Sequence, residues 1–95
     1  MPNIEIHGFS VRFAEQVSGK VVKCLMDAPF ADETVITFCS DAVMDLHGMD
    51  RPYLRILSDE SDEIDATVEL LRPLNIEMEC LMLYKFIPNA PQEKK

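Results

Sequence analysis

The chain has 95 residues, of which 47% are hydrophobic, and this length suits one compact domain with a single core. It carries 17 acidic and 9 basic residues, a net charge of −8, so its surface repels nucleic-acid phosphates and anionic lipid headgroups. The apolar runs are far shorter than the roughly 20 residues that cross a bilayer, and no signal-peptide pattern opens the sequence. We therefore expect a cytoplasmic protein that binds neither nucleic acid nor membrane.

The first part of the chain predicts a strand, a helix and a second strand. Ile4 and Ile6 alternate with polar residues, which is typical of a strand, here over residues 3–9. Ser10 can cap a following helix, which ends near Pro29. The apolar face of that helix comprises Phe13, Val17, Val21, Cys24 and Leu25. The β-branched residues of segment 34–40 predict the second strand, which completes a βαβ unit.

The second part repeats the same order. Residues 41–51 are polar and predict a loop or a bulged strand end, followed by a strand over residues 53–57. Four acids then fall in segment 58–63, which suits the start of a helix better than a calcium loop, because the turn has no glycine. The helix presents Ile64, Val68, Leu71 and Leu74 on one face, and Pro73 closes it. The last strand covers residues 77–87, and residues 89–95 have the composition of a disordered tail.

Two βαβ units in one short chain predict an α+β fold of two layers, in which two helices cover one face of a four-stranded mixed sheet. The middle of the strand at 77–87 is apolar on both faces. A strand of this kind needs cover on both sides, and another subunit can supply the second cover. We therefore expect a homo-oligomer.

The cysteines and histidines do not form a metal motif in the sequence. Cys24, Cys39 and Cys80 are odd in number and far apart, which favours buried thiols in a reducing compartment over a disulfide framework. No CxxC motif occurs, and His7 and His47 are far apart in the sequence. His7 suits a packing or capping role, and His47 an exposed loop. We expect no metal site and no cofactor.

Pro2 is the first candidate for chemistry. The initiator methionine is generally removed before a small second residue, which leaves a proline with a free secondary amine. An α-amino group titrates at about 7.7–8.0, and burial or nearby cations lower that pKa toward neutrality. Such an amine can act as a general base. The alternative is a proline without a catalytic role that precedes an edge strand.

The segment from Pro2 to Arg12 resembles the opening of the 4-oxalocrotonate tautomerases, with a proline, an Ile-His strand and an arginine ten positions after the proline. Residues 27–29, Asp-Ala-Pro, match the end of the first helix in that family. Segment 41–52 is similar to macrophage migration inhibitory factor. It shares Asp41, Met44, Gly48 and Pro52 at the same relative spacing. The resemblance covers residues 2–88 and is strongest to a small bacterial branch of the tautomerase superfamily.

This resemblance implies a fold, an assembly and an activity. It implies one tautomerase-like domain over residues 1–88, whose sheet trimerises into a barrel. In that superfamily the N-terminal proline moves a proton between enol and keto forms of a small acid, without a cofactor. By position, Pro2 would be the base and Arg12 the clamp for the substrate carboxylate, which a guanidinium binds with two hydrogen bonds.

The sequence departs from the family pattern at several positions. The second arginine of the 4-oxalocrotonate tautomerases falls on Thr34, and the lysine of macrophage migration inhibitory factor falls on Pro29. The CxxC of the latter is absent after Pro52, so no thiol oxidoreductase activity is implied. Candidates for a replacement cation in substrate binding are Arg51, Arg55 and Lys85, each of which can equally serve in a surface salt bridge.

Two other functions compete with a tautomerase. The departures at Thr34 and Pro29 favour a trimeric scaffold or ligand-binding protein that has the fold but not the catalysis. The same order of elements also occurs in ferredoxin-like monomers that bind small regulatory molecules. An acylphosphatase of that class is disfavoured, because Gly8 alone precedes Arg12 where a glycine-rich phosphate cradle is needed. Periodicity does not choose between the ferredoxin-like and tautomerase folds.

Overall fold

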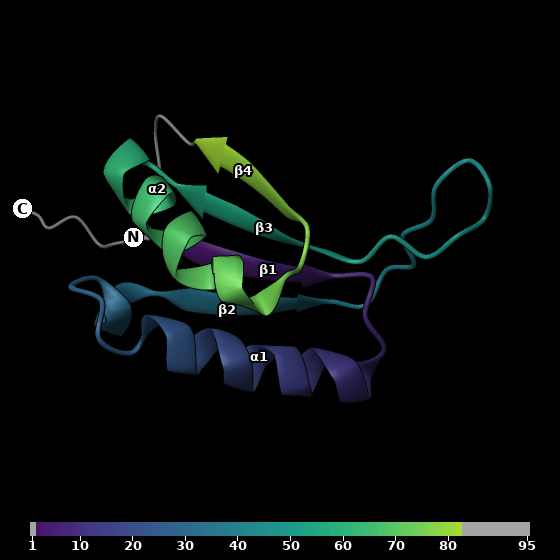
Figure 1. Cartoon of the computed structure of the whole chain (residues 1–95), viewed down its shortest axis with the longest axis horizontal. Coiled ribbons are helices and arrows are strands. Elements are labelled where there is room, and N and C mark those ends of the chain that lie inside the picture. Colours follow the sequence, from purple (N-terminus) through teal and green to yellow (C-terminus); the bar gives the residue numbers. More distant parts are fainter. Residues whose placement is uncertain (1, 83–95) are drawn as a thin grey trace, which may run out of the picture.

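The computed structural model describes residues 2–82. The elements are β1 (Asn3–His7), α1 (Val11–Leu25), η1 (Ala31–Glu33), β2 (Val35–Cys39), β3 (Tyr53–Ser58), α2 (Ser61–Leu71), η2 (Arg72–Leu74) and β4 (Met78–Met82). Both βαβ units predicted from the sequence are therefore present (Figure 1). The end of the predicted last strand, Lys85 and the predicted tail at 89–95 lie outside the described residues. Within them, neither helix has the length and apolar character that a membrane span requires.

The four strands form one sheet in the order β2-β1-β3-β4. β1 pairs in parallel with β2 on one side and antiparallel with β3 on the other, and β4 adds to β3 in parallel. A ferredoxin-like sandwich splits its βαβ units, so that another strand separates the two strands of each unit. Here β1 and β2 are direct neighbours, as are β3 and β4, and this excludes the ferredoxin-like alternative.

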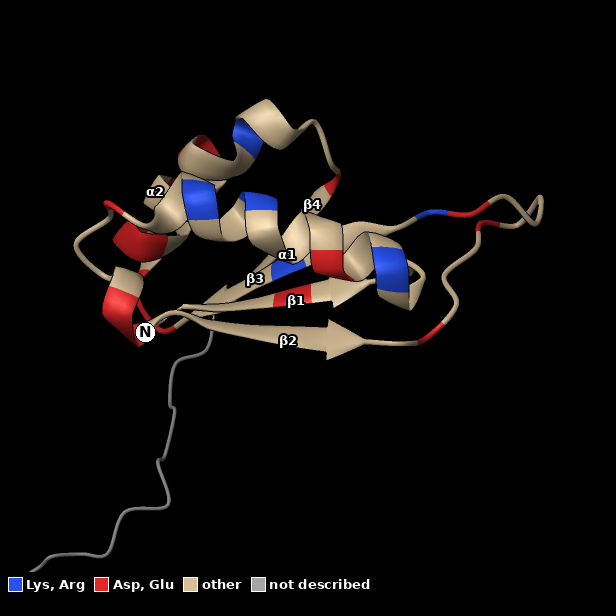
Figure 2. Cartoon of the chain, turned by 90° about the horizontal axis from the view of Figure 1, so that it is seen from below, with Lys and Arg blue, Asp and Glu red and all other residues tan. Residues whose placement is uncertain are grey.

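Both helices cover the same face of the sheet and leave the other face open (Figures 1 and 2). Side chains alternate along each strand, so every second residue points toward the helices. Ile4 and Ile6 of β1 and Leu54 and Ile56 of β3 are at most 1% exposed on the covered side. From the helices, the buried core receives Ala14, Val17, Val21, Leu25, Ile64 and Leu71. This core fixes the position of every strand.

Helix α1 begins as predicted but packs on a slightly different face. Ser10 is the N-cap, and its hydroxyl oxygen accepts a hydrogen bond from the backbone N–H of Phe13 at 3.4 Å. The prediction that Phe13 lies in the core is wrong, since this side chain is 58% exposed and Ala14 is buried instead. A small side chain at this position lets the helix approach the sheet closely.

The two edge strands leave apolar side chains uncovered in a single chain. Val35 and Phe38 of β2 and Leu81 and Met82 of β4 are all about half-exposed. The expectation of buried thiols is wrong for Cys80, which is exposed on β4, and Cys24 and Cys39 are only partly buried. An apolar edge of this kind is typical of a surface that another chain covers.

Removing side-chain volume from the centre of the sheet tests this packing. We expect Ile56→Ala to lower the free energy of unfolding by about 2–5 kcal/mol, because Ile56 is wholly buried between α2 and its sheet neighbours. Leu46→Ala is the matched control, since Leu46 is fully exposed in the loop before β3, and its effect should stay within about 0.5 kcal/mol. Urea denaturation measures both. Equal effects of the two substitutions would contradict this assignment of the core.

Candidate functional site

Pro2 lies where the chain enters the central strand of the sheet. Its carbonyl oxygen accepts a hydrogen bond from the backbone N–H of Val35 at 3.0 Å, and its ring is less than 2% exposed. When the strand register is extended by one residue from Asn3, the neighbours of Pro2 across the sheet are Thr34 on one side and Ser58 on the other. The sheet therefore holds Pro2 in a fixed place, with hydroxyl side chains rather than cations at the two flanking positions.

Arg12 lies at the opposite end of β1 from Pro2. The five residues of β1 advance by about 3.3 Å each, so roughly 15 Å of strand separates the two ends. Arg12 is exposed in the first turn of α1, and within residues 2–82 the structure gives its side chain no ion pair. It follows Val11, which with Phe38 lines an apolar cleft of about 180 Å³. One chain alone therefore does not bring Pro2 and Arg12 together.

Arg51 is held by carboxylates of its own chain. Its guanidinium lies 3.1 Å from Glu77 and 3.5 Å from Asp45. These three residues line a wide groove of about 460 Å³ together with Glu79, so three acids surround one base. The groove is net negative and does not favour an anionic ligand.

Asp45 organises the loop that carries Arg51. Its Oδ1 accepts hydrogen bonds from the backbone N–H of His47 at 2.8 Å and of Met49 at 3.1 Å. The hydrogen bond from Met49 is the largest cause that lowers the pKa of the Asp45 carboxyl below its ordinary value of 3.8, followed by the bond from His47. The positive charge of Arg51 lowers this pKa further. His47 itself is exposed, as the sequence indicated. The Asp45 carboxylate therefore holds the turn of this loop together.

Arg55 is the central cation of the open face. It donates hydrogen bonds from Nε to Glu79 at 2.6 Å, from Nη1 to Glu5 at 3.4 Å and from Nη2 to the Tyr53 hydroxyl at 3.0 Å. The bond to Glu79 raises the pKa of Arg55 further. This guanidinium is already satisfied by neighbouring strands, so it is not free to clamp a substrate. Of the remaining candidate cations, Lys85 lies outside the described residues.

His7 is buried on the same open face between two carboxylates. Its Nε2 lies 2.7 Å from Glu5 Oε1, and its Nδ1 lies 3.3 Å from Asp41. Its ring stacks on Tyr53, with centroids 4.7 Å apart and planes within 5° of parallel. The packing role that the sequence favoured is present, and a hydrogen-bond network is added to it.

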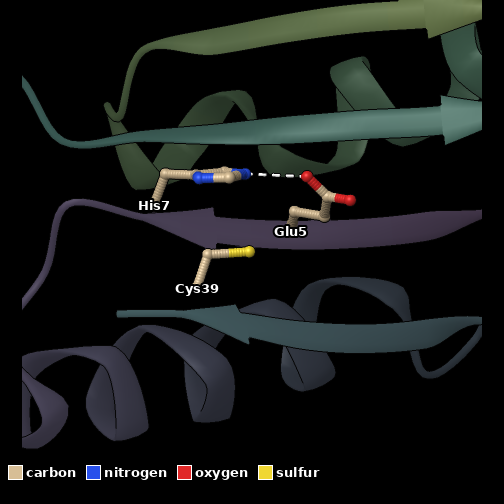
Figure 3. A group of neighbouring side chains, drawn as sticks. All are labelled: Glu5, His7 and Cys39. Atoms are coloured by element: carbon tan, nitrogen blue, oxygen red, sulfur yellow. Dashed lines mark hydrogen bonds and ion pairs between the residues drawn. The ribbon is translucent and has the colours of Figure 1, made fainter. Parts of the chain in front are cut away.

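Cys39 lies directly beside His7, because the parallel register of β1 and β2 pairs these two residues (Figure 3). Burial raises the pKa of the Cys39 thiol, and the carboxylates of Glu5 and Asp41 raise it further. Sequence reasoning missed this group, because residues 7 and 39 become neighbours only when the two strands pair in register. We call Glu5, His7, Cys39, Tyr53, Arg55 and Glu79 together the open-face cluster.

Comparison with known proteins supports the fold and not a specific activity. No family model and no curated protein matches the sequence. Among solved structures, macrophage migration inhibitory factor from Toxoplasma gondii superposes with a TM-score of 0.52 at 12% sequence identity. The alignment covers 99% of this chain and 96% of that one. The chain therefore has the α+β fold of macrophage migration inhibitory factor over nearly its whole length, which confirms the predicted fold class.

Titration of the Asp45 loop gives a pH-dependent test. A carboxyl with a lowered pKa stabilises the fold above its ordinary value of 3.8, and this contribution is lost as the pH falls through the lower folded value. We expect the amide NMR signals of His47 and Met49 to shift only below pH 3.8. In Asp45→Asn, which keeps an acceptor oxygen, the shift should be absent. A transition at or above the ordinary carboxyl pKa would contradict this picture.

Proposed function

We propose, from the fold that this chain shares with macrophage migration inhibitory factor, that it acts as a homotrimeric tautomerase. It would move a proton between the enol and keto forms of a small carboxylate, with Pro2 as general base. Arg12 of a neighbouring copy would hold the substrate carboxylate. The observation that carries the proposal is the position of Pro2, buried and hydrogen-bonded at the start of the central strand of this sheet.

The arginines support this division of roles. Arg51 and Arg55 are paired with carboxylates of their own chain, whereas Arg12 is exposed and has no ion pair within residues 2–82. The cleft lined by Val11 and Phe38 lies at the same end of α1 and is mainly apolar, although Glu15 also lines it. It suits the body of a small acid whose carboxylate binds the Arg12 guanidinium outside the cleft. Among the candidate arginines, Arg12 is therefore the one available to a substrate.

The separation of Pro2 from Arg12 requires a second copy. The two residues lie at opposite ends of β1, so a shared site needs a neighbour that places its Arg12 beside Pro2. The exposed apolar side chains of β2 and β4, among them Phe38 and Leu81, supply surface for such contacts. A closed ring of copies buries these edges and gives each copy one complete site.

The chemistry needs a free amine at Pro2, so Met1 has to be removed. Burial disfavours the charged form of an amine and lowers its pKa, which leaves it able to accept a proton near neutral pH. It would take the enol hydroxyl proton, and the resulting ammonium would return a proton to the substrate carbon. The carboxylate stays bound to Arg12 throughout, so the net change is the shift of one proton.

Substitution of the two residues tests this mechanism. We expect Pro2→Ala to lower the rate of ketonisation of phenylenolpyruvate by about 10²–10⁴-fold, the usual contribution of a positioned general base. Arg12→Ala should chiefly raise KM. Arg72→Ala is the matched control, because Arg72 is an exposed arginine paired with Glu69 on α2, and its kinetics should equal those of the unaltered protein. Mass spectrometry of each sample verifies that Met1 is absent. Unchanged turnover in Pro2→Ala would refute the catalytic role.

A second candidate function keeps the assembly and drops the catalysis. Thr34 and Ser58 flank Pro2 where a cation would help to keep its amine neutral, which favours a trimeric scaffold or ligand-binding protein. Light scattering of the unaltered protein, read together with the assay, separates the two. Both functions predict three times the mass of one chain, and only the tautomerase predicts turnover. A single-chain mass would contradict both.

A further inference from the structure

We propose that Glu5, His7 and Cys39 form a binding site for one zinc ion on the open face of the sheet. A carboxylate oxygen, an imidazole nitrogen and the thiol sulfur of these residues all lie within 4.8 Å of one another (Figure 3). The site does not involve Pro2 or Arg12, although Cys39 also lines the apolar cleft beside Val11 and Phe38.

The backbone brings the three side chains together. The parallel register pairs His7 of β1 with Cys39 of β2, and Glu5 precedes His7 by two residues and so points to the same face. Figure 3 shows all three on the side of the sheet away from the helices. β1 is a central strand with partners on both sides, so two of the three ligands rest on a rigid support.

The chemical types of the three residues select zinc. Thiolate, imidazole and carboxylate are the ligands that zinc uses in proteins, and the thiolate disfavours magnesium and calcium. His7 Nε2 and Glu5 Oε1 are 2.7 Å apart. Two such ligands of a tetrahedral zinc lie about 3.3 Å apart, so a small rotation of the Glu5 carboxylate admits the ion. An imidazole bound through Nε2 carries its one proton on Nδ1, and the thiol proton of Cys39 passes to solvent.

The surroundings of His7 are those of a metal-binding histidine. Asp41 contacts Nδ1 at 3.3 Å, so with Nδ1 protonated the lone pair of Nε2 faces Glu5 and the proposed ion. A carboxylate in this position fixes the tautomer and the ring orientation of zinc ligands in general. The stacked ring of Tyr53 limits rotation further. Asp41 is therefore assigned as a positioning residue of the site.

The local charge also suits a divalent cation. With the ion bound, the Glu5 carboxylate and the Cys39 thiolate balance its two positive charges. Arg55 faces the same Glu5 oxygen at 3.4 Å, but its shorter contact is with Glu79 at 2.6 Å. Arg55 can therefore release Glu5 to a metal and keep its stronger partner. Three protein ligands leave a fourth position for water or a small ligand.

Cobalt(II) added to the full-length protein tests the site, because it occupies zinc sites and reports a thiolate ligand by charge-transfer absorption in the near ultraviolet. We expect this band in the unaltered protein and its loss when zinc is added. Cys39→Ser should abolish the band. Cys24→Ser and Cys80→Ser are the matched controls, since both residues are free thiols outside the site, and they should keep it. Asp41→Asn should weaken zinc binding by about tenfold or more in a chelator competition.

Three results would overturn the proposal. The first is the absence of a charge-transfer band in the unaltered protein. Cobalt bound only by the acids Asp59, Glu60 and Glu63 would give this result, since they offer no thiolate. The second is a band that survives Cys39→Ser. The third is a band that Cys80→Ser removes. Pro2→Ala should bind zinc like the unaltered protein, so failure of the tautomerase proposal and failure of this one are distinguishable.

Discussion

The pairing of β1 with β2 on one side and with β3 on the other is the constraint on which the remaining structure depends. It places Ile4 and Ile6 under the helices and Glu5 and His7 on the open face. It also fixes Pro2 at the entry to the sheet through the hydrogen bond from Val35. The core, the open-face cluster and the proposed base are three consequences of one register.

A single chain leaves one face of the sheet and the apolar side chains of its edge strands without cover. One face of the sheet has no helices on it, the edge strands expose apolar side chains, and Pro2 lies at the other end of β1 from Arg12. The proposed contact with further copies would cover the exposed apolar side chains and bring Pro2 of one copy to Arg12 of another. In the proposed function, the activity would belong to the assembly, and each chain would contribute Pro2 to one site and Arg12 to another.

The sequence predicted what depends on local pattern and missed what depends on pairing between distant segments. Alternation of Ile4 and Ile6 predicted β1, and Ser10 predicted the start of α1, because these signals lie within a few residues of their effect. The proximity of His7 to Cys39 was not predictable, since a shift of one residue in the register would send one of them to the other face. Phe13 was wrongly placed in the core, because the helical repeat of apolar residues does not determine the exact angle at which the helix faces the sheet.

Mixing Pro2→Ala with Arg12→Ala tests the central claim most directly, at a substrate concentration so far below the KM of Arg12→Ala that each variant alone has little activity. Pro2→Ala retains Arg12, and Arg12→Ala retains Pro2, so a trimer assembled from both contains some sites with both residues intact. At equal amounts, random assembly predicts recovery of about a quarter of the unaltered activity after subunits exchange. That recovery would demonstrate a site shared between copies. Mixed trimers without activity, formed from variants whose parent protein is active, would contradict the account.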